Sequence, residues 1–171
     1  MSILSILSLV SLVLLNQVRT TAEGNGARLD ARATHREVQA RLRVILKAAI
    51  APNEIVPPVV WPEIGNSDTL VRFHAPANLI DSSLAFDART PDYPEFTLQF
   101  DAAQGALILQ RTDATGPRQR IGKNLSSFEA NRLEDRSLEL TLTSQKQVRG
   151  ASGSTKMVEE RSVNRVLLHR Q

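Results

Sequence analysis

Cysteine is absent from the 171 residues, and aromatic side chains are scarce, with one Trp, one Tyr and five Phe. Without cysteine the chain has no disulfide, no thiol nucleophile and no cysteine-type zinc site. Few rings are available to stack on bases and the formal net charge is only +3, so we expect no nucleic-acid partner. The 42% hydrophobic and 23% charged residues are typical of one ordinary folded domain, alone or with a long helix.

The sequence also lacks the motifs of common catalytic and metal sites. His35, His74 and His169 stand at no metal-ligand spacing, and we expect each to be a surface or half-buried histidine. No Gly-x-Ser-x-Gly elbow is present, and the GASGST stretch at 150–155 has no lysine where a phosphate-binding loop needs one. The acidic residues near turns form no alternating calcium-binding run. We therefore expect a non-enzymatic chain with no catalytic residue, cofactor or metal.

Charge is missing from residues 2–18, SILSILSLVSLVLLNQV. As a helix, this stretch would extend about 25 Å, slightly short of a hydrocarbon core of about 30 Å. It has neither a basic segment before it nor a small-residue cleavage site after it, which argues against a cleaved secretory signal. We expect residues 1–18 to form a membrane or filament helix, and its apolar residues are Ile3, Leu4, Ile6, Leu7, Leu9, Val10, Leu12, Val13, Leu14 and Leu15.

Serine recurs at every third position inside this apolar run, and Ser5, Ser8 and Ser11 belong to the repeat. Small residues in a stripe let helices approach closely in lipid, so these serines are candidates for a helix-packing stripe. Hydrogen bonds from the serines to carbonyls of their own helix are the alternative, and the sequence does not separate the two.

A second helical pattern occupies residues 19–51. Val38, Leu42, Ile45 and Ala49 follow one another at spacings of four, three and four, which predicts one apolar helix face packed on a sheet. Gly24 and Gly26 weaken the helix before that face, and we expect a bend or a melted turn there. Pro52 is expected to end the helix.

Residues 52–67 are rich in proline and predict a stiff connector, and residues 68–171 change to a period of two. After the DAAQG turn, Gly105 is expected to take a positive φ. Together the helix and these strands predict an α+β fold in which a long N-terminal α-helix packs on an antiparallel sheet of five to six strands. The expected strands are Thr69–Ala75, Glu95–Asp101, Ala106–Arg111, Ser127–Leu133, Ser137–Thr143 and Arg161–His169.

Four stretches carry a resemblance to a known superfamily. They are ILSILSLVSLVLLNQVR, THREVQARLRVILKAAI, the strand region FTLQFDAAQGALILQRTD followed by RIGKNLSSFEANRLED and SLELTLTSQ, and the final VNRVLLHRQ. In this order they resemble the type IV pilin-like superfamily, in particular the J-like minor pseudopilins of type II secretion and the W-like minor pilins. The family's most specific motif, a basic leader and Gly followed by Phe-Thr-Leu-x-Glu, is missing from this chain.

The resemblance implies a pilin-like fold and a structural subunit stored in the inner membrane as a single-pass protein, with its head periplasmic or otherwise extracytoplasmic. Its partners would be inner membrane lipid and other pilin or pseudopilin subunits, contacted through the N-terminal helix in a type II secretion pseudopilus or a type IV pilus. A prepilin peptidase would join them if an upstream leader exists. The basic residues between Arg19 and Lys47 would favour a cytoplasmic flank, so topology stays open. A single-pass membrane-tethered extracytoplasmic binding module is the alternative.

Overall fold

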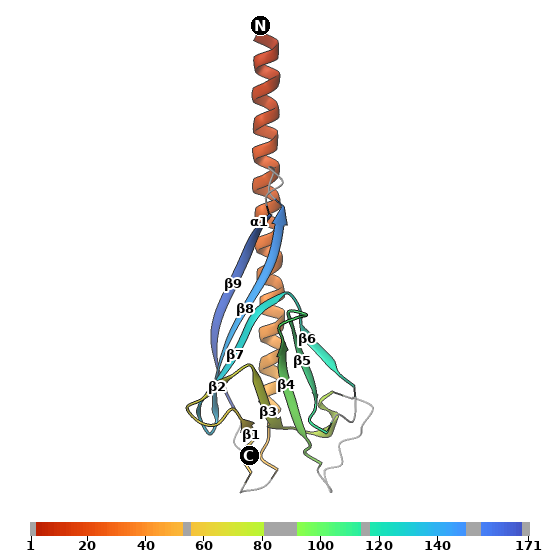
Figure 1. The fold of residues 1–171 in the computed structure, drawn as a ribbon, viewed down its shortest axis with the longest axis vertical. Helices are drawn as coiled ribbons and strands as arrows, with labels where there is room; N and C mark the ends of the chain where they lie inside the picture. Colours follow the sequence, from red (N-terminus) through yellow and green to blue (C-terminus); the bar gives the residue numbers. More distant parts are fainter. Residues whose placement is uncertain (1–2, 53–55, 81–91, 114–116, 150–154, 169–171) are drawn as a thin grey trace.

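The computed structural model describes residues 3–52, 56–80, 92–113, 117–149 and 155–168, without the side chains of residues 3–9 and Arg149 (Figure 1). A 45-residue helix, α1 (Ile3–Lys47), begins the chain, and strands form most of the remainder. The N-terminal part of α1 projects well beyond the sheets, while its C-terminal part lies along them (Figure 1).

The described strands form two antiparallel sheets. The first has five strands in the order β1-β3-β4-β5-β6: Val59–Trp61, Leu70–His74, Glu95–Asp101, Ala106–Arg111 and Gln119–Gly122. The second has four in the order β2-β7-β8-β9: Ser67–Asp68, Leu125–Glu134, Ser137–Arg149 and Thr155–Leu167. A single 3-10 turn, η1 (Ala77–Leu79), follows β3 in the described part of the chain. The strands β8 and β9 form a long hairpin that follows the helix (Figure 1).

The expected α+β class, with one N-terminal helix packed on antiparallel strands, is confirmed, but the expected single sheet of five to six strands is wrong. The described residues form nine strands in two sheets. The strands β4 and β5 coincide with their predicted ranges, because apolar and polar residues alternate along β4 and the DAAQG turn places β5 directly after it. The additional strands β1, β2 and β6 have two to four residues each, too few for an alternating pattern to be recognised.

The two sheets meet at the β4–β5 turn. Gly105 has φ 55°, as expected for a glycine at this turn, and its carbonyl accepts a hydrogen bond of 2.9 Å from the Leu125 amide at the start of β7. A Cβ on Gly105 would lie 2.8 Å from the Leu125 carbonyl oxygen. The absence of a side chain at residue 105 therefore allows the first sheet to touch the second.

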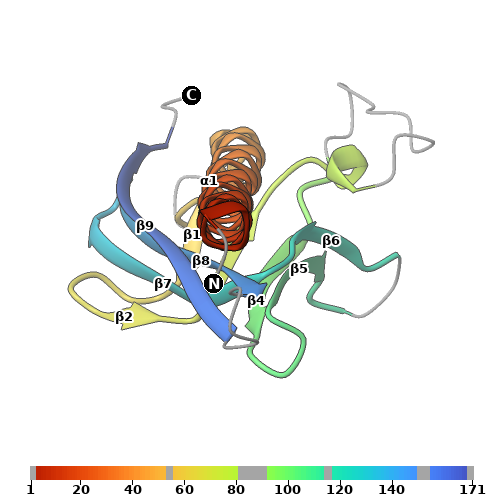
Figure 2. The ribbon, with the colours of Figure 1, turned by 90° about the horizontal axis from the view of Figure 1, so that it is seen from above.

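One apolar core lies between α1 and the sheets, with the helix on one side of both (Figure 2). Phe73 and Phe96 of the first sheet stack with ring centroids 6.1 Å apart, and Phe128 of the second sheet is buried in the same cluster. Leu42 and Leu46 of the helix complete the contact. Burying one such side chain contributes about 1.5–3 kcal/mol, so this cluster holds the helix on the sheets.

The helix differs from expectation at two places. It ends at Lys47 rather than at Pro52, because the chain turns at Ala48 and the Ile50 amide then donates 2.9 Å to the His74 carbonyl of β3. It is also unbroken at Gly24 and Gly26, where a bend was expected. The backbone hydrogen bonds of a helix this long continue through two glycines, whose cost is only about 1 kcal/mol each.

The expected connector 52–67 also differs in its contents. It contains β1 and the first residue of β2, so this segment contributes strands to both sheets and is not only a spacer. The head likewise includes part of the segment expected as a helical continuation over 19–51, because helix residues from Ala27 onward are buried against strands.

Candidate assembly interface on the N-terminal helix

The projecting half of α1 exposes apolar side chains on all of its sides. Leu12, Leu15 and Val18 have relative exposures of 68%, 70% and 66%, and Val10, Val13 and Leu14 are also exposed. At 3.6 residues per turn these positions are distributed around the whole helix. A helix that is apolar all round is normally buried in lipid or among other helices, so this half is the main candidate for an interaction surface.

A polar collar separates the apolar half from the head. It begins at Asn16 and Gln17, whose carbonyls accept hydrogen bonds of 2.9–3.0 Å from the hydroxyl of Thr20. Arg19 follows and pairs with Glu23 one turn later at 3.0 Å. These polar and charged groups are favourable in water and unfavourable in an apolar environment, so the polar part of the helix surface begins near residue 16.

The predicted sheet-facing residues Val38, Leu42, Ile45 and Ala49 are all buried in the structure. The same helix face extends further toward the N-terminus than the apolar pattern suggested, because Ala27 and Ala31 are buried as well. The face lies mainly against β8 and β9 of the second sheet and against β6 of the first (Figure 2). About six turns of α1 are therefore fixed to the head.

A close contact between Val38 and Gly122 of β6 sets the distance between the helix and the first sheet. A Cβ on Gly122 would lie 2.6 Å from Cγ2 and 3.0 Å from Cγ1 of Val38. A side chain would fit there only if Val38, the helix or the strand moved. Sequence reasoning did not identify Gly122, since nothing in QRIG distinguishes a packing glycine from a turn glycine.

His35 lies at the centre of a polar contact between the helix and the β8–β9 hairpin. It is only 4% exposed, which corrects the expectation of a surface or half-buried histidine. Its Nδ1 lies 2.8 Å from the Ser144 hydroxyl, and its Nε2 lies 2.7 Å from the Ser162 hydroxyl and 2.9 Å from the Gln39 amide nitrogen. Burial lowers the pKa of His35 below its ordinary value of 6.5, and the negative charge of Glu160 partly opposes this effect. A neutral imidazole therefore joins three polar partners across the interface.

Only a weak signal in the sequence marks this histidine as buried. It follows Ala27 and Ala31 at spacings of four and precedes Val38 by three, so it belongs to the buried face by position. Small alanines and a polar ring do not register as an apolar stripe, which explains why the pattern was recognised only from Val38 onward.

The other two histidines lie away from this contact. His74 is half-buried, and its Nδ1 is 3.0 Å from the Tyr93 carbonyl. His169 lies outside the described residues.

Three exposed polar pairs attach the helix to the β8–β9 hairpin around His35. Lys146 pairs with Asp30, Arg32 with Glu160 at 3.5 Å, and Arg43 with Asn164 at 3.0 Å. Each exposed pair contributes little energy, typically below 1 kcal/mol, but together they fix the rotation of the helix on the strands. The direction in which each helix face points is therefore well determined by the head.

The N-terminal part of the expected membrane helix is less completely described. The side chains of Ile3, Leu4, Ser5, Ile6, Leu7, Ser8 and Leu9 lie outside the described residues, whereas Ser11 is exposed. Within the residues that the structure describes, no helical stretch is both long and apolar enough to cross a membrane.

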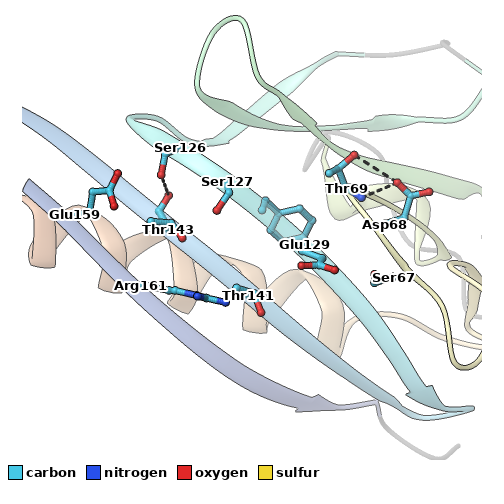
Figure 3. A pocket seen from close by; sticks show the side chains of 11 residues that line it. Ser67, Asp68, Thr69, Ser126, Ser127, Glu129, Thr141, Thr143, Glu159 and Arg161 are labelled. Carbon is cyan, nitrogen blue, oxygen red and sulfur yellow. Dashed lines mark hydrogen bonds between the residues drawn. The ribbon is translucent and has the colours of Figure 1, made fainter. Parts of the chain in front are cut away.

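A polar groove of about 780 Å³ lies on the face of the second sheet opposite the helix (Figure 3). Hydroxyls of Ser127, Thr141 and Thr143 line it together with Glu159 and Arg161 (Figure 3). At the far end Asp68 accepts a hydrogen bond of 2.6 Å from Trp61 Nε1, and this bond is the main reason that the pKa of Asp68 lies below its usual value. No histidine lines the groove, and the described part of the chain contains no group of three or more residues that could hold a metal ion.

Comparison with known proteins gives no match: no family model, no curated protein and no solved structure is similar to this chain.

Proposed function

We propose that this chain is a non-enzymatic structural subunit of the type IV pilin-like kind, a minor pseudopilin or minor pilin. It would be stored in the inner membrane through its N-terminal helix, with its head extracytoplasmic. It would then assemble through that helix into a type II secretion pseudopilus or a type IV pilus.

One observation carries the proposal: a single continuous helix combines a projecting apolar half with a half fixed to the head. The projecting half exposes Leu12, Leu15 and Val18, which have no partner side chains in the described part of the chain that could shield them. Exposing an apolar side chain to water costs about 1.5–3 kcal/mol relative to burying it, so this half needs lipid or other helices. Because α1 is unbroken, the position of the apolar half in a membrane or filament determines the position and orientation of the head.

A second function is favoured by the groove on the outer face of the second sheet. A tethered binding module would use such a surface for its ligand while the helix only anchors the chain. The groove of about 780 Å³ is large enough for a short peptide or a small polar molecule. The two functions differ in what they require of the helix, because an anchor needs only apolar character.

The substitution Leu12→Arg tests the requirement for the projecting helix. It places a charge in the middle of the exposed apolar run, about 40 Å from the core of the head. We expect the protein to leave the membrane fraction and to be absent from filaments, while the free energy of unfolding of the head stays within about 0.5 kcal/mol of wild type. Membrane fractionation, filament pull-down and thermal unfolding provide the three measurements.

The matched control is Ile64→Arg, because Ile64 is an exposed aliphatic residue in a turn of the head. We expect this variant to behave as wild type in membrane and filament assays. A Leu12→Arg protein that still enters filaments normally would refute the proposal. Replacement of residues 1–18 by an unrelated apolar helix separates the alternatives, since a tethered module would keep its function and a filament subunit would not.

A further inference from the structure

The helix has a second apolar face, which points away from the sheets over its whole head-bound length. On this face Leu29 is 66% and Val44 is 70% exposed, although both lie beside the folded core. They continue a stripe that starts in the projecting half. The exposed members of this outer stripe are Leu15, Val18, Ala22, Gly26, Leu29, Ala33, Ala40 and Val44.

The outer stripe is straight and narrow. Its residues repeat after eleven positions, as Val18, Leu29 and Ala40 illustrate, and an eleven-residue repeat matches the α-helix closely. All eight lie within about 80° of one another around the helix axis, and the buried face lies about 180° away. The stripe is about 44 Å long, and Figure 2 shows that no strand covers this side of the helix. The head therefore holds an apolar surface outward rather than hiding it.

The two edges of the outer stripe carry opposite charges at the same height. Arg36 lies at one edge and Glu37 at the other, each about 50° from the middle of the stripe. Both are exposed, and Arg36 has no ion-pair partner among the described residues, while Glu37 pairs only with Arg41 at 2.7 Å on its own helix. Asp30 and Arg32 lie on the same two sides, but both already pair with the β8–β9 hairpin, so the charge complementarity rests on Arg36 and Glu37.

This arrangement is complementary to itself. If two copies of the helix lie side by side and point the same way, a two-fold axis between them places opposite edges together. Glu37 of each copy then faces Arg36 of the other, so that two unlike pairs form at one height. An antiparallel pair would not bring these edges together at that height. Ala22, Gly26, Ala33 and Ala40 leave room for close approach of the two backbones.

We propose that the outer stripe docks a second copy of this chain, helix against parallel helix, from Leu15 to Val44. The inference rests on the proposed function, because two copies anchored in one membrane have their helices in the same orientation and can pack in parallel. It adds a specific partner and a specific helix face, including a part beside the head. Lipid fits this face poorly, because Leu29 and Val44 lie among charged residues such as Arg28, Asp30 and Arg43.

Cysteine cross-linking in native membranes tests the contact, since the chain contains no cysteine of its own. The full-length variants Ala33→Cys and Ala40→Cys each place one thiol in the outer stripe. Ala102→Cys is the matched control, because Ala102 is an exposed alanine in the β4–β5 turn. On mild oxidation we expect disulfide-linked dimers of Ala33→Cys and Ala40→Cys and none of Ala102→Cys.

Charge reversal in the Ala33→Cys background tests the edge pairing. Glu37→Arg alone and Arg36→Glu alone should each lower the dimer yield about fivefold, which corresponds to ~1 kcal/mol. The double variant Arg36→Glu with Glu37→Arg restores the unlike pairs and should regain most of the yield. Equal losses in the single and double variants would overturn the edge pairing.

The outcomes separate this proposal from the proposed function. If Ala33→Cys and Ala40→Cys form no dimer while Leu12→Arg still abolishes filament entry, the docking of a second copy is wrong and the structural-subunit function stands. If both thiols cross-link only to a different protein, the second copy is wrong as the occupant. If dimers form but Leu12→Arg enters filaments normally, the function fails and the stripe contact stands.

Discussion

At the scale of single residues, His35 connects the helix to the β8–β9 hairpin, and it does so as a neutral ring. Its hydroxyl partners Ser144 and Ser162 come from adjacent strands, so one side chain fastens both strands to α1. Truncation to alanine would remove the partner of the buried Ser144 hydroxyl, whereas Ser162 would keep its contacts with Gln39 and Asn164. We therefore regard His35 as the main polar determinant of how the hairpin lies on the helix.

The protonation of His35 predicts how stability depends on pH. Burial lowers its pKa from 6.5, so the unfolded chain takes up this proton at a higher pH than the folded chain. The unfolded state consequently binds more protons between the lowered pKa and 6.5, and the free energy of unfolding falls as pH drops through that window. Above it the contribution of the neutral ring is fully present.

When the pH is lowered from about 7.5 to about 5.5, we expect the thermal unfolding midpoint to fall further in the wild type than in His35→Gln. Glutamine at this position keeps hydrogen-bonding capacity and does not titrate. Thermal unfolding of both full-length proteins at the two pH values measures the difference. His35→Ala should cost about 1–3 kcal/mol at the higher pH. Equal falls in wild type and His35→Gln would exclude His35 as the titrating group.

Gly122 is the other decisive single residue, because it faces Val38 at a distance that excludes a side chain. We expect Gly122→Ala to destabilise the protein by about 1–3 kcal/mol through overpacking. Shortening the opposing residue with Val38→Ala should relieve part of that loss, so the double variant is more stable than the sum of the single effects predicts. Urea unfolding of the four proteins in the cycle measures the coupling, and simple additivity would contradict the contact.

At the scale of elements, α1 is one helix with two different surroundings. The projecting half owes its order to its own hydrogen bonds, whereas the half from Ala27 onward is held by the core. Local changes in the two halves should therefore have different effects. Gly24 and Gly26, near the boundary, allow this to be measured, because a Cβ added at either position would meet no atom within 4 Å.

Gly24→Ala should strengthen the projecting half alone. A Cβ on Gly24 would meet nothing within 4 Å, and alanine is about 1 kcal/mol better than glycine inside a helix. We expect slower amide hydrogen exchange near Gly24 and an unchanged unfolding midpoint of the head. The contrasting variant is Gly65→Ala, which should lower that midpoint because Gly65 has φ +84°. A shifted midpoint in Gly24→Ala would contradict the independence of the two halves.

The strands show which elements a sequence can reveal. β4 alternates cleanly, β5 follows it after a glycine turn, and both were predicted to the residue. β8 extends to Arg149, six residues past the end of the predicted range Ser137–Thr143. β9 begins at Thr155, six residues before the start of the predicted range Arg161–His169. Their outer halves, QKQVR and TKMVEE, are mostly polar on both faces, so periodicity gives no signal there. Pairing between the two strands, not apolar burial, carries these residues into the hairpin.

At the scale of the whole molecule, the α+β class and the helix-on-sheet arrangement follow from the change of period from helical to two near residue 68. The division into two sheets does not follow from the sequence pattern, because it depends on which strands pair with one another. The alternation of residues within one strand does not indicate its partners. Of the candidate interface, the apolar run was evident as a lack of charge. The outer stripe was not, since its significance depends on knowing which helix face the sheets already cover.

The unbroken junction between the two halves of α1 has a geometric consequence. From Ala27 to Ile3 the helix extends about 36 Å beyond its last buried turn. A tilt of the head by about 10° would therefore carry the first helical turn sideways by about 6 Å, roughly the distance between neighbouring side chains. Because the projecting helix is rigidly joined to the head, a rotation of the head produces its largest displacement at the N-terminal end of the helix. Small reorientations at one end become a change of neighbours at the other.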